Sequence, residues 1–292
     1  MIVMGNMIRG ISENGGVIFC GVDSTNLVRT MEQIHKTSAV TSAALGRLLT
    51  AASIMGIMLK NSKDSITLRV NGGGPAGTVL AVADGMGCVK GYVEHPVVEI
   101  PLRPDGKLNV GGAVGRDGTL SIVRDLGLKE PYVGQIPLVS GEIAEDITSY
   151  YATSEQIPTV CALGVLVDPD LTISCAGGYL LQLLPGATEE EITMLEKNIA
   201  NVPSVTTLLQ QGKTMKDIME MVMQGFDPQV LDEYDVEYRC DCTEQRVERA
   251  LISMGRAELE KLAAEEPVVE VNCQFCDKKY HVDVNKLLKS LD

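Results

Sequence analysis

The 292-residue chain has 45% hydrophobic residues and 39 Asp and Glu against 25 Lys and Arg, which gives a net charge of −14. The hydrophobic content excludes wholesale disorder, and the length allows two or more domains. The acidic balance argues against nucleic acid as a partner, because phosphate backbones select basic surfaces. No basic segment followed by a long apolar one opens the chain, so we expect a cytoplasmic protein without a signal peptide.

The first part of the chain is expected to mix strands and helices. Two apolar runs around a turn at 13–16 predict a hairpin over 8–22. A helix should follow, and then a second one over 38–60 that is rich in Ala, Ser, Thr and Gly. This second segment is the most hydrophobic of the chain, but Arg47 and its small residues favour a buried helix over a membrane span.

A glycine-rich loop, Gly72-Gly-Gly-Pro-Ala-Gly77, follows a predicted strand over 65–70 and matches the dinucleotide-binding pattern G-x-G-x-x-G. That pattern requires a helix directly after the loop, because the helix N-terminus holds the pyrophosphate. The residues that follow, from Thr78 to Ala83, have the character of a strand. We therefore interpret the loop as a hairpin turn.

Further strands and one helix are expected to complete the N-terminal domain. Turn signals predict antiparallel sheet over 102–125, and Ser140 caps a predicted helix over 140–151. Three acids of this segment would stabilise the helix start rather than form an acid–base pair: Glu142, Glu145 and Asp146. A hairpin over 159–184 closes an α+β core domain, which we place at residues 1–184.

The composition changes after Pro185-Gly186. Caps at Thr188, Ser204 and Thr214 predict three short helices, and residues 186–239 contain eleven acids and four bases. The apolar residues are few and include many methionines. We interpret residues 185–239 as an acidic helical linker. Self-repelling acids over a thin core are also typical of a segment that unfolds easily.

The C-terminal segment, residues 240–292, contains two close cysteine pairs, Cys240-Asp-Cys242 and Cys273-Gln-Phe-Cys276. Each pair can place two thiolates on one turn, and the insert can bring the pairs together around a tetrahedral metal. Four sulfur ligands favour Zn²⁺. A mononuclear iron site has the same geometry, but the pairs do not match the usual iron–sulfur runs. We expect one Zn²⁺ per chain in a small C-terminal domain, with His281 as a substitute ligand that four cysteines make unnecessary.

The spacing of the cysteines allows a second role besides a structural zinc site. Residues this close can lie within disulfide distance, so an oxidant could join Cys240 to Cys242 and Cys273 to Cys276 and displace the metal. The remaining cysteines are isolated in the sequence, among apolar or small residues. We expect each of them to be a buried residue that packs like a small hydrophobic side chain: Cys20, Cys88, Cys161 and Cys175.

Motifs spread over the chain carry a resemblance to a known family. They include Ala43-Ala-Leu-Gly-Arg47, Gly73-Gly-Pro, Val123-Arg-Asp-Leu-Gly127, Ser140-Gly-Glu-Ile-Ala-Glu-Asp146, Leu163-Gly-Val165, Ala176-Gly-Gly178 and Leu184-Pro-Gly186. Together with the two cysteine pairs, they make the chain resemble the heat shock protein 33 family, the 33 kDa chaperonins, over essentially its whole length.

The resemblance implies an ATP-independent holdase chaperone, not an enzyme, that is inactive while reduced and zinc-bound. Oxidation would release zinc, form the disulfides Cys240–Cys242 and Cys273–Cys276, and unfold the C-terminal domain with the linker. The exposed surface would then bind unfolding client proteins during oxidative and heat stress. The resemblance also implies a cytoplasmic homodimer joined through the N-terminal domain, with neither nucleic acid nor membrane as a partner.

Two other functions fit parts of the same pattern. A constitutively folded zinc-binding interaction module would need only the metal site. A thiol–disulfide oxidoreductase would use Cys273-x-x-Cys276, although no thioredoxin-like βαβ pattern surrounds these residues.

Overall fold

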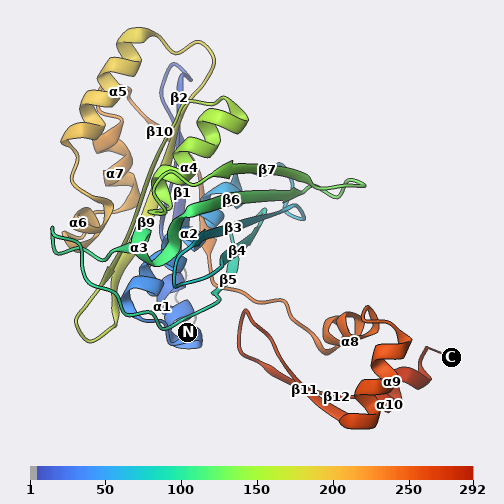
Figure 1. The fold of residues 1–292 in the computed structure, drawn as a ribbon. Coiled ribbons are helices and arrows are strands. Elements are labelled where there is room, and N and C mark those ends of the chain that lie inside the picture. Colours follow the sequence, from blue (N-terminus) through green and yellow to red (C-terminus); the bar gives the residue numbers. More distant parts are fainter. Residues whose placement is uncertain (1–4, 292) are drawn as a thin grey trace. The chain divides into compact units, whose positions relative to one another are not determined.

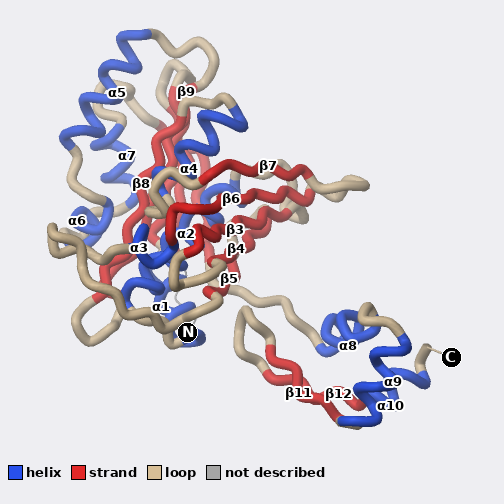
Figure 2. The backbone as a smooth tube through the Cα atoms, in the orientation of Figure 1, coloured by secondary structure: helices blue, strands red, loops and turns tan. Residues whose placement is uncertain are grey.

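The computed structural model describes residues 5–291 and has the α+β architecture expected from the sequence. The chain forms two compact units, Met1–Tyr238 and Arg239–Asp292. The first unit contains two sheets with helices packed on them and between them, and the second contains a two-stranded sheet with short helices (Figures 1 and 2).

Sheet A brings the two ends of the first unit together. In the described residues it has five antiparallel strands in the order β10, β1, β2, β9, β8. The strands are β1 (Gly5–Ile11), β2 (Val17–Asp23), β8 (Thr159–Val167), β9 (Ile173–Leu183) and β10 (Gln229–Val236). Both hairpins predicted for this sheet are confirmed. The sequence did not predict β10, which pairs with β1 at the edge of the sheet.

Sheet B is built from the middle of the chain. Its five described strands are antiparallel in the order β5, β4, β3, β6, β7. They are β3 (Ser65–Gly73), β4 (Val79–Asp84), β5 (Val89–Val93), β6 (Gly115–Asp125) and β7 (Tyr132–Pro137). The prediction of sheet over 102–125 was partly wrong, because 102–109 contains no strand and α3 (Val110–Val114) precedes β6. The sequence also did not predict β7.

The glycine-rich loop is the turn between β3 and β4, as interpreted from the sequence. Its glycines allow the loop backbone to pack closely against the backbone of residues 113–115. A Cβ atom on Gly72 would lie 2.2 Å from the carbonyl oxygen of Gly115, and one on Gly74 would lie 2.4 Å from that of Ala113. The loop therefore needs glycine for close packing.

Helix α2 (Ala39–Ile57) is the centre of the first unit. It contacts strands of both sheets, and α1 (Thr25–His35) packs beside it. Its length and hydropathy would suit a membrane span, but 94% of that stretch is buried inside the protein. Close packing depends on its small residues, since a Cβ atom on Gly56 would lie 2.5 Å from the carbonyl oxygen of Asp84. The prediction of a buried helix is confirmed.

The helix predicted over 140–151 begins later than expected. The observed elements are α4 (Ala144–Tyr150) and the π-helical turn η1 (Tyr151–Glu155). Ser140 does not cap the helix, because a loop ordered by Asp146 precedes it. The buried Asp146 carboxylate accepts backbone N–H bonds from Val139 at 2.7 Å, Ser140 at 3.1 Å, Gly141 at 3.4 Å and Ile143 at 3.0 Å.

Glu142 also departs from the predicted role of a helix-start acid. It lies in the loop before α4, where its carboxylate binds the Arg47 guanidinium at 2.7 Å and accepts the Gly111 N–H at 3.0 Å. Asp146 therefore orders the loop before α4, and Glu142 pairs with the partly buried Arg47.

The predicted linker helices pack on one face of sheet A (Figure 1). They are α5 (Glu189–Asn201), α6 (Val205–Gln210) and α7 (Met215–Val222). Thr188, Ser204 and Thr214 cap them, as the sequence predicted. This segment belongs to the first compact unit.

The second unit is small. Its elements are α8 (Glu244–Ile252), α9 (Arg256–Glu265), β11 (Val268–Asn272), β12 (Lys279–Asp283) and α10 (Val284–Lys289). Its apolar cluster has five buried side chains: Leu259, Val269, Val282, Val284 and Leu287. The Asp283 side chain caps α10.

The Asp146→Asn substitution tests the loop before α4. An amide can replace only one of the two carboxylate oxygens, so buried N–H groups lose their acceptor. We expect a loss of about 3 kcal/mol in the free energy of unfolding of the reduced protein, measured by urea denaturation. The exposed Asp117→Asn control should change it by less than about 0.5 kcal/mol. If both variants lost equally little free energy of unfolding, the Asp146 carboxylate would not be what orders the loop.

Candidate metal centre

Two short segments of the second unit present the four cysteines. Cys240 and Cys242 precede α8, which begins where the Thr243 side chain accepts the N–H of Arg246 at 3.3 Å. Cys273 and Cys276 lie in the turn between β11 and β12. There the Cys273 N–H donates to the Lys278 carbonyl at 2.9 Å, and the Asp277 N–H donates to the Cys273 carbonyl at 2.8 Å. This tight turn directs both of its thiols to one side.

The four sulfur atoms form one cluster. All of them lie within 4.8 Å of one another, with Cys240 Sγ 3.7 Å from Cys273 Sγ and Cys242 Sγ 3.4 Å from Cys276 Sγ. A tetrahedron with metal–sulfur bonds of about 2.3 Å has sulfur–sulfur distances of about 3.8 Å. The cysteines therefore fit a metal ion with four sulfur ligands. Such a closed shell leaves no open position for hydrolytic chemistry.

A tyrosine supports one of the four thiols. The Tyr280 hydroxyl on β12 donates to Cys242 Sγ at 3.1 Å, and the Tyr280 side chain is nearly buried. Burial acts to raise the pKa of Cys242, but hydrogen bonds from Tyr280 and the neighbouring thiols outweigh it and lower the pKa to about 7. Burial instead raises the pKa of Cys276 to about 11. One thiolate is thus favoured before a metal binds, and metal binding releases protons from the other thiols.

The sequence did not reveal the role of Tyr280. Tyr280 lies on β12. A tyrosine in a strand is common, and only the fold shows that this one faces a sulfur atom. His281, considered as a substitute ligand, faces away: it is exposed and pairs with Glu270 at 3.2 Å.

The other four cysteines belong to the first unit. Cys20, Cys88 and Cys175 are buried and Cys161 is partly buried, close to the prediction. Burial raises the pKa of Cys20 to about 12 and that of Cys175 to about 11, so both stay as inert thiols. Cys20 and Cys161 pair with Leu180 from its two sides, so a whole strand separates them. That separation exceeds the reach of a disulfide.

Comparison with known proteins gives one consistent result. The family model described as "Hsp33 protein" matches residues 5–283. The 33 kDa chaperonin of Clostridioides difficile (strain 630) is 47% identical over 285 residues, which cover 98% of each chain. That of Alkaliphilus metalliredigens (strain QYMF) is 46% identical over 286 residues, with the same coverage. The crystal structure of the 33 kDa chaperonin (heat shock protein 33 homolog) from Thermotoga maritima matches with a TM-score of 0.90 at 36% identity, over 99% of each chain.

The Tyr280→Phe substitution tests the support that the tyrosine gives to the cluster. It keeps the ring but removes the hydrogen bond to Cys242, so the thiolate form becomes less favoured. We expect zinc affinity at neutral pH, measured by competition with a chromophoric chelator, to fall about tenfold. The apparent pKa of the first thiol of the metal-free protein should rise above about 7, as followed by thiolate absorbance.

Tyr132→Phe, at an exposed position on β7, is the matched control and should leave zinc affinity unchanged. If Tyr280→Phe retained full zinc affinity and the same titration, the hydrogen bond to Cys242 would have no part in metal binding.

Proposed function

The chain belongs to the Hsp33 family, and from this premise we propose that it is a redox-regulated, ATP-independent holdase. In the reduced state the protein is folded and inactive, with one Zn²⁺ held by Cys240, Cys242, Cys273 and Cys276. In the oxidised state it binds unfolding proteins and prevents their aggregation. It carries out no catalytic turnover, and it works as a cytoplasmic homodimer joined through the core at residues 1–184.

The proposed switch begins at the sulfur cluster. Bound zinc would keep all four sulfurs as thiolates and join the two cysteine segments. Peroxide oxidises the thiolates in pairs: each pair gives up two electrons, a sulfur–sulfur bond forms, and one H₂O₂ takes up two protons from solvent and is reduced to two waters. Cys240 joins Cys242, and Cys273 joins Cys276. Disulfide sulfurs cannot hold the metal, so the two segments separate.

The small size of the second unit supports unfolding after metal loss. Its apolar cluster has five buried side chains, and α8 has none. Metal binding commonly contributes about 10 kcal/mol or more to the folding of such units, which is comparable to the whole stability of a domain. A unit with so little buried apolar surface would not stay folded without it.

The linker, residues 185–239, is directly connected to this unit. Its last strand, β10, pairs along the whole of β1 and ends four residues before Cys240 in the sequence. Tyr238 then contacts the core, where its hydroxyl donates to the Gly91 carbonyl at 2.8 Å and lies 3.1 Å from His35 Nε2. Motion of the cysteine segments would pull first on these contacts and then on the edge of sheet A.

The observation that carries the proposal is the apolar cluster shared by sheet A and the linker helices. On the sheet it contains Ile8, Val17, Phe19, Tyr179 and Leu181, with the two aromatic rings stacked at 5.5 Å. The helices cover it with Leu195, Val205, Leu208, Met215, Ile218, Met219, Val222 and Met223. Unfolding of the linker would expose both sides of this cluster. Flexible methionines suit binding to varied clients.

Light scattering of an aggregating client tests this function. Reduced, zinc-loaded protein should leave aggregation of a thermally unfolding client unchanged, and peroxide-treated protein at equal concentration should suppress most of it without ATP. The active form should yield separate tryptic peptides, 240–246 and 262–278, each about 2 Da lighter than its reduced form, as expected for disulfides within each pair.

Three results would contradict the proposal. Equal suppression by both forms would indicate a constitutive interaction module. Turnover of a disulfide substrate without suppression would indicate an oxidoreductase. Peptides linked through Cys240–Cys273 or Cys242–Cys276 in the active form would mean that oxidation locks the two segments together instead of releasing them.

A further inference from the structure

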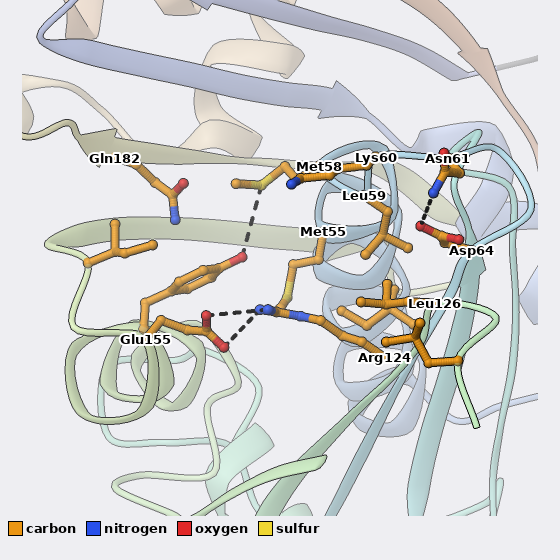
Figure 3. Close-up of a pocket in the computed structure, with 14 residues that line it drawn as sticks. Met55, Met58, Leu59, Lys60, Asn61, Asp64, Arg124, Leu126, Glu155 and Gln182 are labelled. Atoms are coloured by element: carbon orange, nitrogen blue, oxygen red, sulfur yellow. Dashed lines mark hydrogen bonds and ion pairs between the residues drawn. The ribbon is translucent and has the colours of Figure 1, made fainter. Parts of the chain in front are cut away.

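A pocket in the first unit lies far along the chain from the cysteine cluster. Its volume is about 430 Å³, which is in the range of small-molecule sites. Figure 3 shows that its walls come from the C-terminal end of α2 and the loop after it, from β6 and the loop that follows, and from η1. The residues belong to a single compact unit, so the pocket is formed by one packed structure.

Most of the pocket wall is apolar. Met55 and Met58 line the side formed by the C-terminal end of α2, and Leu126 and Leu128, from the loop after β6, line another side. The two leucines are 38% and 70% exposed, unusually high for large apolar side chains beside a cavity. Methionine side chains adapt to different shapes. These walls fit an aliphatic ligand that would cover the leucines.

Two polar pairs in the pocket are already satisfied. The Arg124 guanidinium binds both carboxylate oxygens of Glu155, at 3.0 and 3.3 Å, and the Tyr150 hydroxyl donates to Glu155 at 2.6 Å. Asn61 donates to the Asp64 carboxylate at 3.0 Å. The acids of the pocket therefore have partners, and neither calls for a cationic ligand.

Three other polar groups keep unused hydrogen-bonding capacity. Gln182 is only 6% exposed, and its amide donates one of its two N–H groups to Thr159 at 3.1 Å. Its second amide N–H and its carbonyl oxygen have no partner among the described residues. The Tyr151 hydroxyl, also buried, has the Met58 sulfur at 4.0 Å as its hydrogen-bond partner, a weak acceptor. Lys60 lines the pocket and forms no ion pair in the described part of the chain.

The π-helical turn η1 places Tyr151 and Glu155 in the pocket wall. Such turns are rare and occur often at functional sites. Burial raises the pKa of Tyr151 well above its ordinary value, so its hydroxyl remains protonated at physiological pH and can donate. The pocket thus combines a neutral donor, an amide and one unpaired cation with apolar walls.

We propose that this pocket binds a medium-chain alkyl monocarboxylate. The single unpaired cation, Lys60, matches one negative charge, and the Tyr151 hydroxyl and the free amide proton of Gln182 can donate to carboxylate oxygens. The alkyl chain lies along the methionines and covers Leu126 and Leu128. A saturated chain of roughly eight to ten carbons suits a pocket of this size.

Titration calorimetry of the reduced, zinc-loaded full-length protein tests the ligand class, with sodium decanoate as the probe below its micelle concentration. Affinity should rise up to about fourfold for each methylene from hexanoate to decanoate, because each one buries apolar surface. Decyltrimethylammonium has the same chain and the opposite charge, and it should bind at least tenfold more weakly. No decanoate binding, or equal binding of both head groups, would overturn the proposal.

A pair of charge reversals tests the position. Lys60 and Lys63 are both exposed and change the net charge equally, but of the two only Lys60 lines the pocket. Lys60→Glu should weaken decanoate binding at least tenfold, and Lys63→Glu should change it less than twofold. Equal losses would show a general charge effect instead of a site. Neither substitution touches the core, and both variants should keep the wild-type unfolding midpoint.

Discussion

The contact on which the second unit and the proposed switch depend is the approach of four cysteine sulfurs within 4.8 Å of one another. The apolar cluster of the surrounding unit has only five buried side chains, so a bound metal would supply the stability that a larger core provides elsewhere. In the proposed switch, the thiolates that would bind the metal are also the groups that would react with peroxide, so stability and sensitivity to oxidant would reside in the same atoms. A larger apolar core would keep the unit folded without metal, so oxidation of the cysteines would not unfold it.

Stability is distributed unevenly over the first unit. Helix α2 is enclosed between two sheets and almost all of its residues are buried, whereas α5 buries only Leu195. The linker helices cover one face of sheet A, and β10 pairs with the sheet on one side only. Loss of the linker would remove one layer and one edge strand but leave α2 enclosed. In the proposed switch, this difference would let a local change expose apolar surface while the core remains folded.

Features carried by local pattern could be predicted from the sequence: the cysteine pairs, the buried helix with its glycines, the hairpin around the glycine-rich loop and the threonine and serine caps of the linker helices. Features that depend on contacts between residues distant in the sequence could not be predicted. Strand β10 is rich in acids and mostly exposed, as suits an edge strand. It is a strand because it pairs with β1, which is more than 200 residues away in the sequence. The loop before α4 depends on Asp146 accepting bonds from residues upstream of it. Tyr280 contacts Cys242 across 38 residues of sequence.

The central claim is that oxidation of the cysteine cluster unfolds the linker while the core persists, and hydrogen exchange tests it most directly. After full oxidation and zinc release, amides of α5, α7 and β10 should lose protection together with those of the second unit. Amides of β3 and α2 should keep the protection they have in the reduced protein. If the linker amides remained protected in oxidised protein that suppresses aggregation, clients would bind elsewhere and the coupling between cluster and linker would be contradicted.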